Sequence, residues 1–336
     1  MVRVLVGAAE RGRPQQYRRE IAAVLPPSLA DAQFTFDLHD GDDDWDPGLA
    51  DAEALVLTSR GLGAAAVAAA RCLRFVQKLG PPLGRAALHA CRERGILVSV
   101  LPDAGHVAVA EHTLSLILAA ARRLVATHEA TRRGENPAGL VPVRSTQTMR
   151  HVNWLGYAED DFRLLADQTL GLVGFGAIAR EFVRRAAPLF ARVVYTKRQR
   201  LAADEEKQWG VDYLPLRSLL AQADVVCVLA TQADGAPPIL GASELCQMKR
   251  GAWLVNTARG NQVDQVAITR ALREHLGGAA LDVFETEPAL DRELLDLPNV
   301  LLSPHTASLM PTGRRFAVAL DNIERVWAGL HPRGAV

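Results

Sequence analysis

The sequence of 336 residues has few cysteines, no excess charge of either sign and no long apolar run. Lys plus Arg and Asp plus Glu number 38 each, so the positive field typical of proteins that bind nucleic acid or anionic membranes is missing. No run approaches the ~20 apolar residues of a membrane span, and the apolar part of "MVRVLVGAAERGR" is too short for a signal peptide. The cysteines form no C-x-x-C pair, and their apolar or helical surroundings favour buried thiols over a metal or redox site. We therefore expect a cytoplasmic protein with no nucleic-acid partner, no membrane partner and no metal; its cysteines are Cys72, Cys91, Cys227 and Cys246.

What is present is an alternation of short apolar runs with helical stretches. This alternation is typical of βα units that build a parallel sheet, and near-continuous apolar strands suit a sheet covered on both faces. In the first part of the chain the pattern predicts strands at 2–8, 53–59, 73–77 and 96–101 and helices at 13–25, 63–72 and 83–95. After residue 168 it predicts strands at 169–176, 192–196, 224–230, 252–258, 278–284 and 299–305, and a last helix at 313–330. Between these parts lie a long helical pattern at 106–134 and a loop-like segment at 135–162; residues 40–45 read as a solvated acidic loop.

A glycine-rich turn follows the predicted strand at 169–176. Gly174-Phe175-Gly176-Ala177-Ile178-Ala179 is a G-x-G-x-x-A motif between a strand and a helix, the context of a dinucleotide site. Gly174 permits a tight turn, Gly176 lets a pyrophosphate approach the helix N-terminus, and Ala179 lets helix and strand pack closely.

The next predicted strand ends in basic residues where NAD sites usually place a carboxylate. Thr196 is followed by Lys197 and Arg198, with Arg200 beyond. Lys and Arg attract a 2′-phosphate, whereas a carboxylate would repel it. We expect NADP(H) to be preferred over NAD(H), which stays the alternative cofactor. The other interpretation is that these cations are solvated surface residues that bind no ligand.

Three further motifs place polar residues at the ends of predicted strands, where ligands bind in open α/β sheets. "LVNTARGNQVD" carries Arg259, "GGAALDVFETEP" carries Asp282 and Glu287, and "NVLLSPHTAS" carries His305. Together with "AEHTLSLILA" at 110–119 and "TLGLVGFGAIA", these motifs resemble, in order and spacing, the D-isomer-specific 2-hydroxyacid dehydrogenases. The sequence is most similar to the glyoxylate/hydroxypyruvate reductase branch.

The resemblance implies a residue for each step of reducing a 2-oxo acid to a D-2-hydroxy acid. His305 would be the general acid and base, because an imidazole titrates near working pH. Glu287 would hydrogen-bond and orient that imidazole, and Arg259 would hold the substrate carboxylate and polarise the carbonyl. The cofactor would contact Gly174, Phe175, Gly176, Ala177, Ile178, Thr196, Lys197, Arg198, Thr257 and Asp282, the last at the nicotinamide carboxamide.

The resemblance also implies the architecture: two doubly wound parallel-sheet domains with a cleft between them. A flavodoxin-like substrate domain would comprise residues 1–105 plus 312–336, and a Rossmann cofactor domain would be inserted at 106–311. The helix at 106–134 resembles the element that forms a homodimer in the family. His106 and His112 on that helix are expected to serve helix packing or the interface.

The segment "KLGPPLGR" at 78–85 departs from the family pattern. Relatives carry a loop similar to "GVGVDNID" here, and the Val-Gly backbone N–H groups that grip the substrate carboxylate fall on Pro81 and Pro82, which have none. Three interpretations stay open: the N–H groups of Leu83 and Gly84 replace them; Arg85 or Lys78 supplies a side-chain clamp; or the substrate is unusual.

Two other functions stay open beside the enzyme. Some relatives are dinucleotide-sensing corepressors, which would make catalysis vestigial here. Others oxidise phosphite or formate. The presence of Arg259, Glu287 and His305 favours the dehydrogenase.

Overall fold

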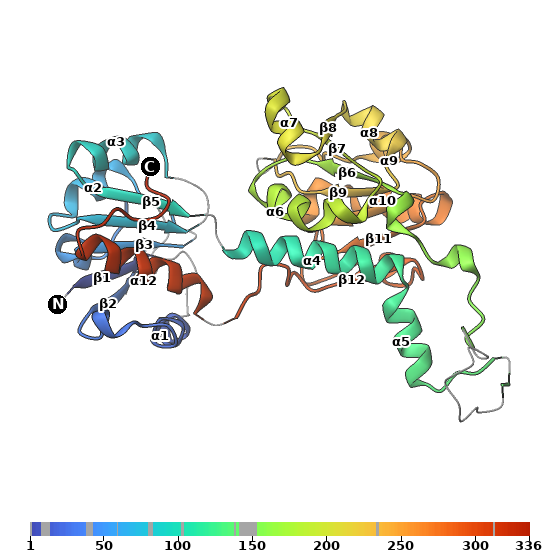
Figure 1. Ribbon diagram of the computed structural model, residues 1–336, viewed down its shortest axis with the longest axis horizontal. Helices are drawn as coiled ribbons and strands as arrows, with labels where there is room; N and C mark the ends of the chain where they lie inside the picture. Colours follow the sequence, from blue (N-terminus) through green and yellow to red (C-terminus); the bar gives the residue numbers. More distant parts are fainter. Residues whose placement is uncertain are drawn as a thin grey trace. The chain divides into compact units, whose positions relative to one another are not determined.

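The computed structural model describes residues 2–7, 14–37, 43–58, 60–79, 83–101, 104–137, 139–140, 153–232, 235–311 and 313–336. The chain divides into two compact units, one of Met1–Gly105 with Met310–Val336 and one of His106–Leu309. Each unit has its own parallel sheet (Figure 1), which confirms the predicted α/β fold class. No helix in these ranges is long and apolar enough to cross a membrane.

The first unit has a five-stranded sheet in the order β2-β1-β3-β4-β5, the order of flavodoxin-like folds. All four pairings are parallel. The strands are β1 (Arg3–Gly7), β2 (Gln33–Asp37), β3 (Ala54–Leu57), β4 (Phe75–Leu79) and β5 (Leu97–Leu101). The sequence pattern predicted all of them except β2, a strand at the edge of the sheet.

Helices cover both faces of this sheet, and the alternation of side chains along the strands sets the faces. Val4 and Val6 of β1 pack with α1 (Pro14–Ala22) and α12 (Arg314–Trp327), whereas Leu5 packs with α2 (Ala64–Ala69) and α3 (Arg85–Glu93). The C-terminal helix therefore belongs to the first unit, because its buried face completes that unit's core. Asn322 of α12 donates hydrogen bonds to Gln77 of β4 at 2.7 Å and to Ser99 of β5 at 3.1 Å.

The second unit has a seven-stranded sheet in the order β12-β11-β10-β9-β6-β7-β8. β6 lies between β7 and β9, so the strand order reverses at its carboxyl end, where open α/β sheets bind ligands. The strands are β6 (Thr169–Val173), β7 (Arg192–Thr196), β8 (Asp212–Tyr213), β9 (Val225–Val228), β10 (Trp253–Asn256), β11 (Gly278–Leu281) and β12 (Val300–Leu302).

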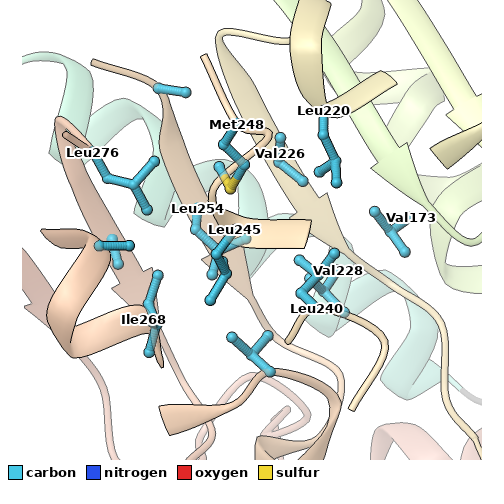
Figure 2. Close-up of a cluster of buried hydrophobic side chains, with 14 of the residues drawn as sticks. Val173, Leu220, Val226, Val228, Leu240, Leu245, Met248, Leu254, Ile268 and Leu276 are labelled. Atoms are coloured by element: carbon cyan, nitrogen blue, oxygen red, sulfur yellow. The ribbon is translucent and has the colours of Figure 1, made fainter. Parts of the chain in front are cut away.

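Two helical layers cover this larger sheet. On one face Leu254 and Val226 pack against α8 (Leu216–Gln222), α9 (Ala242–Leu245) and α10 (Gln265–Glu274), as Figure 2 shows. On the other face Leu170 and Val255 pack against α4 (Ala104–Ala121) and α6 (Ala177–Ala186). Two further helices are α7 (Ala203–Trp209) and α11 (Arg292–Leu295).

The single helix predicted at 106–134 is two helices, α4 and α5 (Leu124–Arg132). The break is at Arg123, whose φ of 50° lies in the left-handed region. The carbonyl of Ala121, which a continuous helix would use internally, accepts the N–H of Arg163 at 3.0 Å. A contact from a distant segment therefore ends α4.

Two other expectations need correction. Cys91 and Cys227 are buried, and burial raises the pKa of both thiols, but Cys72 and Cys246 are exposed because they lie in the turns that follow α2 and α9. The described end of the acidic loop is also not simply solvated, because the side chain of Asp43 accepts the N–H of Ala66 in α2 at 3.1 Å.

Candidate active site

The glycine turn after β6 leaves room for a pyrophosphate. Gly174 has φ +102°, and a Cβ there would lie 2.7 Å from the nitrogen of Ala230, so the position requires glycine. Gly176 caps α6, and a Cβ there would meet nothing within 4 Å. The first N–H groups of α6, from Ala177 onward, have no partner within the helix, which is the arrangement that binds phosphate. Ala179 is fully buried, as close helix–strand packing requires.

Phe175 contributes to this turn only through its backbone. Its ring is buried and lies 4.9 Å from the ring of Tyr195 in β7, within the core beneath the turn. Its carbonyl accepts a hydrogen bond from Lys197 Nζ at 3.5 Å. The N–H of Gly174 in turn donates to the carbonyl of Thr196 at 2.9 Å, so the end of β7 and the glycine turn are joined.

The basic residues after β7 have different surroundings. Arg200 forms two hydrogen bonds of 2.8 Å with Glu206, and these, with a third from Tyr195, lower the pKa of the Glu206 carboxyl. Arg198 is exposed and has no hydrogen bond or ion pair to any residue that the structure describes. Arg198 therefore has its donors available to a ligand.

His305 and Glu287 form a pair at the carboxyl ends of β12 and β11. Nδ1 of His305 lies 2.6 Å from Oε2 of Glu287, while Oε1 of Glu287 accepts the N–H of Phe284 at 2.9 Å. Because a carboxylate can only accept, Nδ1 carries a hydrogen and Nε2 is the nitrogen left to exchange a proton. Partial burial alone would raise the pKa of Glu287, but the hydrogen bonds from His305 and Phe284 and the charge of the imidazole together lower it.

Arg259 follows β10 in a turn that the sequence builds tightly. The buried side chain of Asn256 accepts the N–H of Ala258 at 3.1 Å and donates to the carbonyl of Arg259 at 3.0 Å. A Cβ on Gly260 would lie 1.8 Å from the carbonyl oxygen of Phe284, so this turn packs directly on the segment that holds Glu287.

The guanidinium of Arg259 is exposed and free of acidic partners. Within the described part of the chain, its one hydrogen bond goes to the carbonyl of Ala258 at 2.6 Å, and no carboxylate lies within ion-pair distance. The remaining N–H groups are therefore available to a carboxylate ligand.

Asp282 is fully buried at the end of β11. Its Oδ1 accepts hydrogen bonds from Ser303 Oγ at 2.6 Å and from the N–H of Thr306 at 2.9 Å, and its Oδ2 accepts the N–H of Ala307 at 2.9 Å. In the structure this carboxylate holds the segment that carries His305; its expected contact with a nicotinamide stays a prediction.

Thr257 is also buried, and its hydroxyl lies 2.8 Å from that of Thr113 in α4. Sequence reasoning did not find the supporting residues around these sites, namely Asn256, Gly260, His112 and Ser303.

In the first unit, Lys78 is buried and its ammonium donates to the carbonyls of Thr58 and Leu79. Pro81 and Pro82 lie outside the described residues. Gly84 is the N-cap of α3 and has no side chain to satisfy the first N–H groups of that helix, and a Cβ there would meet nothing within 4 Å.

Comparison with known proteins identifies the family to which the chain belongs. The family model "D-isomer specific 2-hydroxyacid dehydrogenase, NAD binding domain" matches residues 114–307. The chain belongs to this family. This dehydrogenase is 36% identical over 261 residues to a glyoxylate reductase of Korarchaeum cryptofilum, covering 77% of this chain and 74% of that one.

Solved structures show the same fold over the whole dehydrogenase. The TT0316 protein of Thermus thermophilus has 31% sequence identity and a TM-score of 0.64, with 100% of both chains covered. An NADPH-dependent glyoxylate/hydroxypyruvate reductase of Sinorhizobium meliloti has a TM-score of 0.67 at 23% identity, covering 100% of this chain and 97% of that one, which is a likeness of fold. The resemblance expected from the motifs is confirmed.

Proposed function

We propose that this dehydrogenase reduces a 2-oxo acid of the glyoxylate or hydroxypyruvate type, or a larger one, to the D-2-hydroxy acid, with NADP(H) preferred over NAD(H). The observation that carries the proposal is the 2.6 Å hydrogen bond between His305 Nδ1 and Glu287 Oε2, together with an exposed Arg259 that has no acidic partner among the described residues. A proton donor and a carboxylate-binding cation are the two groups that this reduction requires from the protein.

Each side chain then has one task. When bound, the nicotinamide supplies the hydride that the substrate carbon receives. His305 donates a proton from Nε2 to the substrate oxygen, and Glu287 keeps Nδ1 protonated and stabilises the positive charge on the ring in the reverse direction. Arg259 holds the substrate carboxylate and polarises the carbonyl through its charge.

The cofactor preference rests on Arg198. The open space at Gly176 and the free N–H groups of α6 suit a pyrophosphate, which any nicotinamide dinucleotide has. A 2′-phosphate requires cations at the end of β7, and Arg198 is exposed there with its donors unused.

For the substrate-binding residues of the first unit, the first interpretation of the "KLGPPLGR" segment, together with the Arg85 part of the second, has the better support. Leu83, Gly84 and Arg85 lie at the N-terminus of α3, where backbone N–H groups have no partner within the helix. Arg85 is exposed, whereas the ammonium of Lys78 is bonded to backbone carbonyls. We propose that these N–H groups and Arg85 bind the carboxylate in place of the two missing proline donors.

We also propose that the enzyme is a homodimer formed through α4 and α5. Leu124 and Val125 at the start of α5 are 59% and 51% exposed, an arrangement that a second subunit would cover. Light scattering coupled to size-exclusion chromatography measures the molar mass directly, and a monomer would exclude this assembly.

The test is a screen of NADPH and NADH oxidation with glyoxylate, hydroxypyruvate, pyruvate, bulky 2-oxo acids and phosphonate analogues. We expect turnover with at least one 2-oxo acid and a higher kcat/KM with NADPH. His305→Ala should lower kcat by roughly two or more orders of magnitude while NADPH binding persists. Absence of turnover across the panel, or normal turnover by His305→Ala, would refute the proposal.

A further inference from the structure

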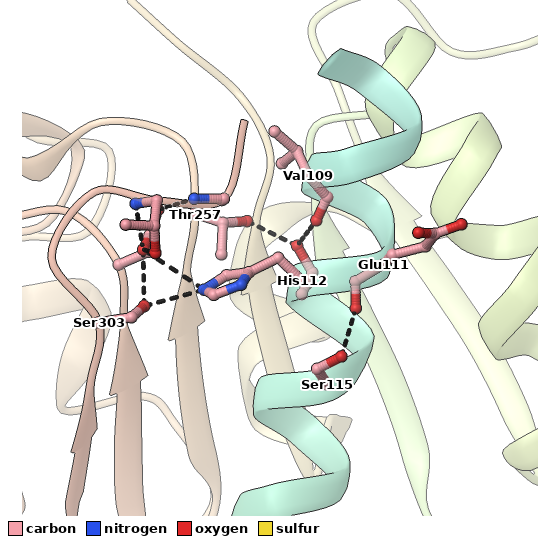
Figure 3. A network of polar contacts seen from close by, with 10 residues as sticks. Val109, Glu111, His112, Ser115, Thr257 and Ser303 are labelled. Carbon is pink, nitrogen blue, oxygen red and sulfur yellow. Dashed lines mark hydrogen bonds and ion pairs between the residues drawn. The ribbon is translucent and has the colours of Figure 1, made fainter. Parts of the chain in front are cut away.

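We infer that His112 of α4 is a positioning residue for His305. Figure 3 shows His112 reaching from the helix to Ser303 at the end of β12. The buried Asp282 lies 3.4 Å from Nε2 of His112. The inference rests on the proposed function, because it assigns to His112 the task of fixing the proton donor of that reaction. Sequence reasoning placed His112 in helix packing or an interface, and the structure adds a polar partner, Ser303.

Asp282 holds the backbone at His305 and at the two residues that follow it. The N–H of His305 donates to the carbonyl of Asp282 at 2.8 Å, and the next two N–H groups, of Thr306 and Ala307, donate to its carboxylate at 2.9 Å each. His305 itself has φ 54°, in the left-handed region that residues other than glycine rarely adopt. Such a conformation persists only where its surroundings enforce it, and these three hydrogen bonds to one residue do so.

The direction of the hydrogen bonds makes His112 a donor. Ser303 Oγ lies 2.6 Å from Oδ1 of Asp282, and an ionised carboxylate can only accept, so the single hydroxyl hydrogen of Ser303 points to Asp282. Oγ of Ser303 must then accept from Nε2 of His112, which lies 2.9 Å away. Nε2 is also 3.4 Å from Oδ1 of Asp282. His112 therefore fixes the Ser303 hydroxyl in the orientation that serves the carboxylate.

The residue next to His112 makes a second connection. Thr113 Oγ1 donates to the carbonyl of Val109 within α4 at 2.7 Å, so its oxygen accepts from the hydroxyl of Thr257, 2.8 Å away. Thr257 follows β10 and lies two residues before Arg259. One turn of α4 thus joins the ends of β10 and β12, which carry Arg259 and His305 (Figure 3).

The experiment removes the donor and then restores it. His112→Leu keeps an apolar side chain on α4 but cannot donate, whereas the amide nitrogen of His112→Gln can reach Ser303 in place of Nε2. Ser115→Ala is the matched control, because among the described residues the Ser115 hydroxyl bonds only to the carbonyl of Glu111 in the same helix. The measurements are kcat and KM for NADPH and the 2-oxo acid, and amide hydrogen exchange of the peptide that contains Thr306 and Ala307.

We expect His112→Leu to lower kcat by roughly 10- to 100-fold, because small displacements of a proton donor cost that much, with KM for NADPH unchanged. Hydrogen exchange at Thr306 and Ala307 should become faster, and His112→Gln should recover most of both losses. If His112→Leu fails to fold, Ser303→Ala removes the same connection and is expected to give the same result.

Three results would overturn the inference: unchanged kcat in His112→Leu, unchanged exchange at Thr306 and Ala307, or a loss in His112→Gln as large as in His112→Leu. If the unmodified enzyme turns over no 2-oxo acid, the proposed function fails, and the exchange measurement still decides whether His112 holds the His305 segment.

Discussion

Replacing Glu287 by glutamine tests the central pair of the site, because the structure gives its carboxylate two donors at once. Oε1 accepts the N–H of Phe284 at 2.9 Å and Oε2 lies 2.6 Å from His305 Nδ1. Glutamine has one acceptor oxygen and one NH2 group, so the side chain in Glu287→Gln cannot accept from both donors. Either the backbone N–H of Phe284 or the Nδ1–H of His305 loses its partner, and the negative charge beside the imidazole is gone in both cases.

The size of the effect follows from the hydrogen bond and its exposure. A hydrogen bond to a charged group contributes about 1.5–3 kcal/mol, and the side chains of His305 and Glu287 are 46% and 33% exposed, so solvent screening favours the lower part of that range. About 1.5–2 kcal/mol corresponds to a roughly 10- to 30-fold fall in kcat. The assay is steady-state NADPH oxidation at saturating substrate.

The matched control is Glu285→Gln. It removes the same charge two residues before Glu287, and the side chain of Glu285 is exposed and has no partner among the described residues. A normal kcat in Glu287→Gln, or an equal fall in Glu285→Gln, would refute the reasoning.

The same variant has a pH signature in stability. The pKa of Glu287 is lowered in the folded protein, so the stabilisation from its ionised form is present above the pKa of the unfolded chain and is lost as the pH falls through the lower folded pKa. The difference in Tm between the unmodified enzyme and Glu287→Gln should therefore be largest near neutral pH and should disappear as the pH falls into the acid range.

Arg198→Ala should lower kcat/KM for NADPH by about tenfold or more and leave kcat/KM for NADH unchanged. Arg200→Ala should not alter the ratio of kcat/KM for NADPH to that for NADH, because the guanidinium of Arg200 is bonded to Glu206. Equal ratios for the two variants would contradict the assignment. Gly174→Ala should lower Tm, because the added Cβ would lie 2.7 Å from backbone and φ is +102°. Gly176→Ala should keep Tm and weaken NADPH binding in a titration, since only ligand space lies beside it. Arg60→Met should cost about 3–5 kcal/mol in urea unfolding, because it leaves a buried carboxylate 2.7 Å away without its guanidinium; a loss below about 1 kcal/mol would show that the pair contributes little.

The fold was predictable where local pattern and burial agree. The strands β6 and β7 begin at the predicted residues, because an apolar run buried on both faces is visible in the sequence itself. β2 escaped prediction because residues 33–37 form an edge strand with alternate side chains exposed, which leaves no apolar run. The break at Arg123 was equally hidden, since it depends on an N–H from Arg163, forty residues further along the chain.

The candidate site divides in the same way. Arg259, Glu287 and His305 stand in motifs whose order and spacing can be read in the sequence. His112 and Ser303 are 191 residues apart and neither belongs to a pattern that signals a hydrogen bond. Gly260 is likewise required because of a tertiary contact: a Cβ there would lie 1.8 Å from the carbonyl oxygen of Phe284, in the segment that follows β11. Residues that support a site through tertiary contact leave no local signal, so the structure is needed to find them.

Two carboxylates that follow β11 control one histidine in different ways, and their burial decides which task each has. Asp282, fully buried, meets backbone N–H groups and so determines the path of the chain through His305. Glu287, a third exposed, meets the imidazole and so determines which ring nitrogen carries the hydrogen. The two carboxylates could not exchange these tasks. A buried carboxylate needs several hydrogen-bond donors, and the backbone segment around His305 supplies them. With its backbone held by Asp282 and its Nδ1 held by Glu287, His305 has Nε2 as its remaining functional atom, and the proposed function assigns proton exchange with the substrate to that nitrogen.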